Sequence, residues 1–180
     1  MTIRPATAAD ARGIAETHVA SWRSSYRGIV PEERLTALDA GGRVDFWAGK
    51  LEAMQSPECC FVAVDGDEGV VMGFVSAGPA RAEGEDNLGT DAEIFAIYLL
   101  ESAKGRGLGR GLMRAAACCL RDGGCRSVSL WLLKENPARG FYERFGGWIT
   151  GEKPYVTGGF TLPSIGCRWD DIEALIAALS

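Results

Sequence analysis

A glycine-rich segment between an apolar run and a helical pattern is the feature that most limits how this chain can fold. Residues 104–109 read Lys-Gly-Arg-Gly-Leu-Gly. The apolar run at 94–100 predicts a strand, and the apolar spacing over 108–120 predicts a helix. Glycines let the backbone turn tightly and bring its N–H groups close to a ligand, and the positive end of the following helix lies at the same place. The junction therefore predicts a phosphate-binding site. Positive charge is added by Lys104, Arg106 and Arg110.

Two common nucleotide-binding motifs do not match this segment. A dinucleotide loop requires G-x-G-x-x-G, but the sixth position is Arg110 when counted from Gly105, and Leu112 when counted from Gly107. A Walker loop requires Gly-Lys followed by Ser or Thr, and the one Gly-Lys pair, at 49–50, is followed by leucine. The spacing therefore indicates another phosphate compound.

The loop reads Lys104-x-x-Gly107-x-Gly109 and does not stand alone. Three further segments accompany it in a fixed order: residues 3–7 with Asp10, residues 92–99, and Asn136 with residues 140–148. Together they resemble the GNAT superfamily of acyl-CoA-dependent N-acetyltransferases, whose pyrophosphate loop reads R/Q-x-x-G-x-G/A. The match departs from the family at Lys104, where Gln or Arg is usual, and at Glu101, where Pro is common.

This resemblance implies an α+β GNAT fold in a single domain over residues 1–180. The central sheet would be mixed and mostly antiparallel, splayed apart at strands 4 and 5, with helices on both faces. The order of elements along the chain predicts the same architecture, with one parallel step through the glycine-loop helix. Periodicity predicts strands at 2–6, 59–64, 70–77, 92–99, 128–133, 148–155 and 160–169, and helices after Asp10 and at 44–54, 108–120, 136–145 and 172–179. A turn is expected at 65–69 and polar loops at 24–31 and 79–89.

The resemblance also implies acetyl-CoA as the acetyl donor, without a metal. In the family the pantetheine arm lies between the splayed strands like an extra strand. Carried over residue by residue, the expected cofactor-binding positions are Ile97, Tyr98, Leu99, Lys104, Gly105, Arg106, Gly107, Leu108, Gly109, Arg110 and Asn136. A plain tight turn is the alternative for the glycines, and a helix cap before Pro137 is the alternative for Asn136.

Glu93 is a charge inside an otherwise apolar strand, which is costly unless the side chain is exposed or functional. An alkylamine with a pKa of about 10.4 is neutral in only about one molecule in a thousand at pH 7, so acetyl transfer to it benefits from a base. Glu93 falls at the catalytic glutamate position of the histone-acetylating branch of the superfamily. The alternative is a solvent-facing carboxylate at a strand edge.

Tyr142 matches the tyrosine that serves as general acid in many family members. The alternative is core packing between Phe141 and Phe145. Neighbouring helical residues point about 100° apart, so Tyr142 would face the cofactor if both phenylalanines packed inward.

Trp22, Tyr26 and Arg27 lie where the family builds one wall of the acceptor site, although Trp22 is also a good core anchor. The resulting prediction is direct acetyl transfer to a primary amine of a small molecule or an amino-acid-like compound. Two alternatives stay open: acetylation of a protein N-terminus or lysine, and a non-catalytic acyl-CoA-binding sensor.

Composition limits the remaining function classes. The formal net charge of −5 disfavours a nucleic-acid partner. No apolar stretch approaches the roughly 20 residues of a membrane span, and no signal-peptide core is visible at the start, so we expect a cytoplasmic protein without a membrane partner. The sequence leaves the choice between a monomer and a homodimer open.

The six cysteines include no C-x-x-C pair and are interpreted as small apolar residues in a reducing compartment. The alternative is a cysteine nucleophile with the single histidine, His18, as its base. Because His18 shares the apolar face of the first predicted helix, we expect it to be partly buried rather than catalytic.

Overall fold

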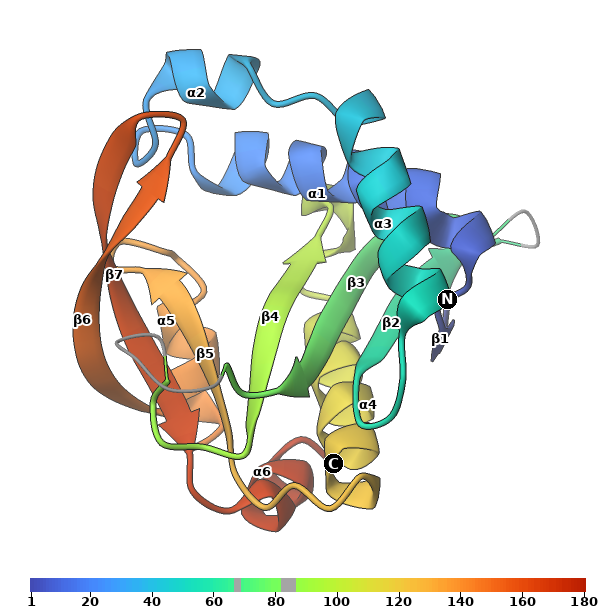
Figure 1. The fold of residues 1–180 in the computed structure, drawn as a ribbon, viewed down its shortest axis with the longest axis vertical. Coiled ribbons are helices and arrows are strands. Elements are labelled where there is room, and N and C mark those ends of the chain that lie inside the picture. Colours follow the sequence, from blue (N-terminus) through green and yellow to red (C-terminus); the bar gives the residue numbers. More distant parts are fainter. Residues whose placement is uncertain (67–68, 82–86) are drawn as a thin grey trace.

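The computed structural model describes residues 1–66, 69–81 and 87–180, which form one seven-stranded sheet with helices on both faces (Figure 1). The strands are β1 (Thr2–Pro5), β2 (Cys59–Asp65), β3 (Val70–Pro79), β4 (Ala92–Leu99), β5 (Val128–Leu133), β6 (Trp148–Thr157) and β7 (Phe160–Trp169). The helices are α1 (Ala11–Ser25), α2 (Glu32–Thr36), α3 (Gly41–Ala53), α4 (Leu108–Asp122), α5 (Arg139–Arg144) and α6 (Ile172–Ala178), with short 3-10 turns at Ala8–Asp10 and Glu101–Ala103.

Every strand and every helix expected from periodicity is present. The structure also contains one helix that was not predicted, α2, which lies directly after the segment that we interpreted as a loop. It spans five residues after Pro31, too few to show a helical repeat. The expected turn at 65–69 and polar loop at 79–89 fall partly on residues 67–68 and 82–86, which lie outside the described residues.

The splay predicted between the fourth and fifth strands is present. The strands are ordered β1-β2-β3-β4-β5-β7-β6, and β4 and β5 form the parallel pair. Their register contains two pairs, Ala92 with Val128 and Glu93 with Ser129. Beyond these pairs the strands diverge toward α1 (Figure 1). An extended ligand can therefore pair with backbone groups that the sheet itself does not use at this point.

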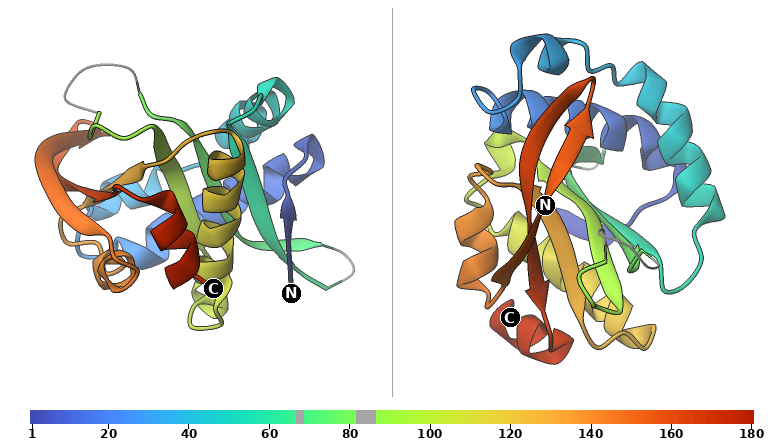
Figure 2. Two further views of the ribbon diagram at one scale, coloured as in Figure 1. Left: turned by 90° about the horizontal axis from the view of Figure 1, so that it is seen from below. Right: turned by 60° about the vertical axis from the view of Figure 1, so that its left-hand side comes forward.

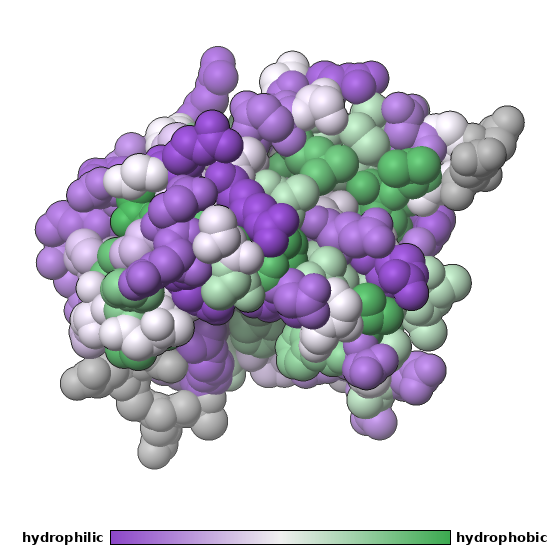
Figure 3. Space-filling model, turned by 90° about the horizontal axis from the view of Figure 1, so that it is seen from above, coloured by the Kyte–Doolittle hydropathy of each residue, from purple (hydrophilic) through white to green (hydrophobic). Residues whose placement is uncertain are grey.

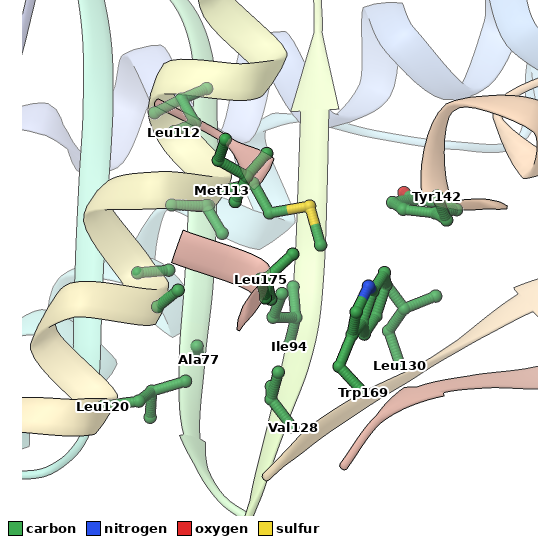
Figure 4. Close-up of a cluster of buried hydrophobic side chains, with 14 of the residues drawn as sticks. Ala77, Ile94, Leu112, Met113, Leu120, Val128, Leu130, Tyr142, Trp169 and Leu175 are labelled. Atoms are coloured by element: carbon green, nitrogen blue, oxygen red, sulfur yellow. The ribbon is translucent and has the colours of Figure 1, made fainter. Parts of the chain in front are cut away.

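Helices cover the two faces of the sheet in different ways (Figure 2). On one face, α1 and α3 pack against β2 and β3 around Ile14, Trp47 and Phe74. On the other face, α4 and α6 pack around Leu112 and Leu175 (Figure 4). Alternate residues of a strand point to opposite faces, which explains how one short strand such as β2 supplies both clusters.

His18 lies on α1 within a group of aromatic rings. Its imidazole stacks on Tyr98 with ring centroids 4.8 Å apart, and Trp22, Trp47 and Phe74 lie around it. Its Nδ1 atom is buried and has no hydrogen-bond partner among the described residues. Burial, with a smaller contribution from the nearby Arg43 charge, lowers the pKa of His18 from 6.5 to about 4. The imidazole is therefore neutral at physiological pH.

The lowered pKa of His18 predicts acid sensitivity of the fold. The unfolded chain binds a proton on His18 below about pH 6.5, whereas the folded chain does so only near pH 4. The free energy of unfolding should therefore drop by about 2 kcal/mol between about pH 7.5 and pH 5 on account of this group. Urea denaturation at both pH values measures the drop, and His18→Phe should remove that part of it. An equal pH dependence in both proteins would contradict the prediction.

Candidate active site

The glycine loop has the backbone conformation that only glycine adopts without strain. Gly105 and Gly107 have φ angles of +72° and +78°, in the left-handed region. Gly107 is the residue that precedes the first turn of α4, and it offers no side chain to cap that helix. The first N–H groups of α4 are therefore left for a ligand, at the positive end of a 15-residue helix.

A cavity of about 830 Å³, here called the large cavity, opens at this loop. It is bounded by the end of β4, the start of α4, α5 and the last turn of α1. The expected cofactor positions in its wall are Ile97, Tyr98, Leu99, Lys104, Gly105, Gly107, Gly109, Arg110 and Asn136. Two expected positions are not in the wall: Arg106 is exposed to solvent, and Leu108 is buried in the core beneath α4.

Two of the three cations at the loop, Lys104 and Arg110, already have partners. Lys104 Nζ donates to Glu101 Oε2 at 2.6 Å and to Ser25 Oγ at 3.1 Å. Arg110 Nη1 donates to the carbonyl of Ser180 at 3.3 Å. Because Glu101 offsets the charge of Lys104, the backbone N–H groups of the loop are the stronger candidates for holding a pyrophosphate.

One charged residue in the wall of the large cavity, Arg144, is not among the positions predicted from the sequence. It follows Tyr142 on α5 and is exposed to solvent. Its position in the wall results from the packing of α5 onto the sheet, which no local sequence signal specifies.

The arrangement considered above, with Phe141 and Phe145 packed inward and Tyr142 facing the cofactor, is not the one observed. Tyr142 is the buried member, at 6% exposure, whereas Phe141 and Phe145 are partly exposed and line the large cavity. Tyr142 also reaches that cavity, and its ring meets Trp169 edge to face at 6.2 Å (Figure 4). One residue thus contributes both to the core and to the cavity wall.

Asn136 adopts the capping arrangement and faces α1 as well. Its Oδ1 accepts a hydrogen bond from the N–H of Ala138 at 2.8 Å, just before α5. Its Nδ2 donates to the hydroxyl of Tyr26 at 3.1 Å. The side chain therefore connects the β5–α5 turn to the end of α1.

A second cavity of about 130 Å³, here called the small cavity, lies between β4 and β5. Its wall is largely aromatic and includes Trp22, Tyr26, Phe95, Tyr98, Trp131 and Tyr155. The face that carries α1 and α2 is mostly hydrophilic on its left side in this view and carries several hydrophobic residues on its right side, with a hollow between the two (Figure 3).

Glu93 lies in the wall of the small cavity and is 2% exposed. The interpretation as a solvent-facing carboxylate at a strand edge is therefore wrong, since β4 has neighbours on both sides and Glu93 is buried. Arg81 Nη2 donates to its Oε1 at 2.6 Å. A buried carboxylate is stable when it is paired in this way, and the pairing favours its ionised form.

The three expected acceptor positions differ in where they lie. Trp22 and Tyr26 line the small cavity and also belong to a core cluster with Leu35 and Leu133. Arg27 is exposed and lies in the wall of neither cavity. The structure thus brings Trp22 and Tyr26 to Glu93 but leaves Arg27 at the surface.

Three further observations concern metal groups, thiols and membrane helices. Within the described residues no group of three or more His, Cys, Asp or Glu side chains could hold a metal ion. All six cysteines are free, and His18 lies in the wall of neither cavity. Among the described residues, no helix combines the length and the apolarity needed to cross a membrane.

Comparison with known proteins agrees with this geometry. Residues 19–147 match the model of the acetyltransferase (GNAT) family. The uncharacterized N-acetyltransferase YuaI of Bacillus subtilis (strain 168) is 36% identical over 180 residues, which is all of this chain and 99% of that protein. The chain therefore belongs to the GNAT acetyltransferase family, and it is an acyltransferase.

Solved structures share the fold. A GCN5-related N-acetyltransferase from Rhodopseudomonas palustris superposes with a TM-score of 0.71 at 21% identity, covering 93% of each chain. The yncA protein of Salmonella typhimurium, solved with its cofactor acetyl-CoA, gives a TM-score of 0.67 at 21% identity, covering 94% of this chain and 92% of that one.

Proposed function

We propose that this protein transfers an acetyl group from acetyl-CoA to the primary amine of a small molecule, directly and within one ternary complex. The observation that carries the proposal is the position of the two cavities. The large cavity meets the glycine loop and the uncapped start of α4, and the small cavity adjoins it beside a buried carboxylate. Acetyl-CoA fits the first because its pyrophosphate suits a helix N-terminus, and because its pantetheine arm can lie along the end of β4, where that strand has separated from β5.

A compact acceptor is favoured by the volume of the small cavity, about 130 Å³. The tip of the β6–β7 hairpin lies beside α2 (Figure 1). Tyr155 of β6 packs against Trp22 of α1 with ring centroids 6.3 Å apart, and Arg34 of α2 donates to the Thr157 hydroxyl at 2.9 Å. A peptide needs an open groove on both sides of its reacting amine, which these contacts obstruct.

In this proposal Glu93 accepts a proton from the amine, directly or through water. The hydrogen bond that Arg81 donates to its Oε1 favours the carboxylate, which is the form that can accept a proton. Acetyl-CoA supplies an activated acetyl group and a thiolate leaving group. Tyr142 lies in the large cavity, where it can donate a hydrogen bond to the sulfur as charge builds there.

The proposal is tested by measuring the turnover of acetyl-CoA in the presence of different amines. Release of free thiol from acetyl-CoA should depend on small primary amines or amino acids, and mass spectrometry should show one added acetyl group on the amine. Peptides with free N-termini or lysines, at the same concentration, serve as the comparison. Acetylation of peptides alone would contradict the small-molecule acceptor, and CoA binding without turnover on any amine would indicate a sensor.

Tyr142→Phe tests the proposed hydrogen-bond donor. Burial raises the pKa of Tyr142 above its ordinary value, so the phenol holds its proton and acts by hydrogen bonding rather than by complete proton transfer. We expect kcat to fall about tenfold, since one hydrogen bond to a developing charge contributes about 1.5 kcal/mol or more. The KM for acetyl-CoA should change much less, because the interaction is strongest in the transition state. An intact kcat with a lower melting temperature would make Tyr142 a packing residue.

A further inference from the structure

Two tyrosines, Tyr26 and Tyr98, stand in the walls of both cavities. If the large cavity holds acetyl-CoA and the small cavity holds the amine, the new carbon–nitrogen bond must form where the two cavities adjoin. Side chains at that boundary therefore touch the reacting atoms. This inference rests on the proposed function and adds a residue to its mechanism.

The hydroxyl of Tyr26 is held in a defined orientation. The N–H of Ala138 donates to Asn136 Oδ1, which fixes the amide so that its NH₂ group faces Tyr26. An amide NH₂ can only donate, so the Tyr26 oxygen is the acceptor of the 3.1 Å bond from Asn136 Nδ2. The phenolic proton of Tyr26 must then point away from Asn136. The neighbouring Tyr98 hydroxyl is its acceptor in this structure, and a bound acetyl carbonyl oxygen would replace that acceptor.

The ring of Tyr26 is equally restricted. It is 5% exposed and packs edge to face on Trp22 with centroids 4.9 Å apart. It stands at the C-terminal end of α1, which is tied to β4 by a 2.7 Å hydrogen bond from Ser21 Oγ to the carbonyl of Leu99. Burial, and then the neighbouring hydroxyls of Tyr98 and Tyr142, raise the pKa of Tyr26 well above its ordinary value. The group is thus a fixed donor that keeps its proton.

We propose that Tyr26 is a further catalytic residue, whose hydroxyl donates a hydrogen bond to the acetyl carbonyl oxygen, and that Asn136 is the positioning residue that orients it. The amine nitrogen uses its lone pair to form the bond to the carbonyl carbon, and the π electron pair of the carbonyl moves onto oxygen. That oxygen then carries the charge that the Tyr26 hydrogen bond stabilises. When the carbonyl re-forms, the carbon–sulfur bond breaks with its electron pair on sulfur. The amine proton leaves to Glu93, which returns it to solvent, and the CoA thiolate takes up one proton from solvent. Tyr26 keeps its own proton.

Tyr26→Phe is the first test, because it removes the hydroxyl and retains the ring. We expect kcat to fall at least tenfold, on the order of the effect of losing one oxyanion donor. The affinity for CoA, measured by calorimetry, should stay within about twofold, since the hydrogen bond is strongest in the transition state. Tyr155→Phe is the matched comparison: Tyr155 lines the small cavity alone, so its effect should fall mainly on the KM for the amine.

A double-mutant cycle with Asn136→Ala tests the positioning, at saturating acetyl-CoA. Asn136→Ala alone should lower kcat, and should have little further effect once the Tyr26 hydroxyl is gone, because both changes then remove one interaction. If the effects of Tyr26→Phe and Asn136→Ala on kcat add in full, Asn136 does not position Tyr26. If Tyr26→Phe does not fold, the role of Tyr26 is tested by the kcat of Asn136→Ala alone. A kcat equal to that of the wild type would overturn the proposal.

Two outcomes separate this inference from the proposed function. A wild-type enzyme that acetylates amines, together with a folded Tyr26→Phe variant of unchanged kcat, would overturn the role of Tyr26 and leave the function standing. A wild-type protein that acetylates no amine would overturn both.

Discussion

Replacing Glu93 with glutamine is expected to lower kcat about 10²-fold, the usual contribution of a general base. Glutamine keeps the shape of the side chain and can still accept the hydrogen bond from Arg81, but it cannot take a proton from the amine. Raising the pH should restore part of the rate, because a larger fraction of the amine is then already neutral. The measurement is kcat as a function of pH for both proteins.

A matched control separates the loss of a base from the loss of an ion pair. Glu152 on β6 is paired with Lys134 and is exposed to solvent, so Glu152→Gln removes a carboxylate outside both cavities. We expect its kcat to match the wild type. Full activity of Glu93→Gln at pH 7, in a folded protein, would assign Glu93 a structural role alone.

Replacing Gly109 with valine is expected to weaken CoA binding more than tenfold, or by over about 1.4 kcal/mol. A Cβ at Gly109 would lie 3.5 Å from a methyl carbon of Leu99 and 3.7 Å from the ring of Phe141, which is ordinary contact distance. The residue is helical, so valine should fold there with a small cost in helix propensity. Its two extra methyl groups would enter the large cavity beside the loop, where the cofactor must approach the backbone.

Gly109→Ala is the control for this change. The loop pattern of the family accepts alanine at the corresponding position, so we expect its CoA affinity to stay near the wild-type value. Gly107 is less suitable for the test, because its φ of +78° would strain any larger residue whether or not CoA binds there. Calorimetry measures the CoA affinity of both variants. An unchanged affinity of folded Gly109→Val would show that CoA does not bind at this loop.

The sequence predicts the scaffold of the site well, for identifiable reasons. The glycine loop is recognisable from three glycines that are close together in the sequence. Two of them, Gly105 and Gly107, adopt positive φ angles. The strands around it are long enough for their apolar pattern to be visible. Helix α2 is missed because five residues carry no periodicity, although its Arg34 donates a hydrogen bond to the β6–β7 hairpin that lines part of the small cavity.

The site itself depends on contacts between distant segments, which the sequence does not display. The burial of Glu93 and its pairing with Arg81 follow from its place in an inner strand. The hydrogen bond between Tyr26 and Asn136 joins residues 110 positions apart. The orientation of α5 decides that Tyr142 is buried while Phe141 and Phe145 line the cavity, and helical spacing alone permits either arrangement.

The most direct test of the proposed function is the structure of the protein bound to CoA. We expect the pyrophosphate to accept hydrogen bonds from the N–H groups of residues 105–110, at the start of α4. The pantetheine arm should lie between β4 and β5, with its sulfur at the boundary marked by Tyr26 and close to Tyr142. CoA bound at another surface, with the gap between β4 and β5 empty, would contradict the assignment of both cavities.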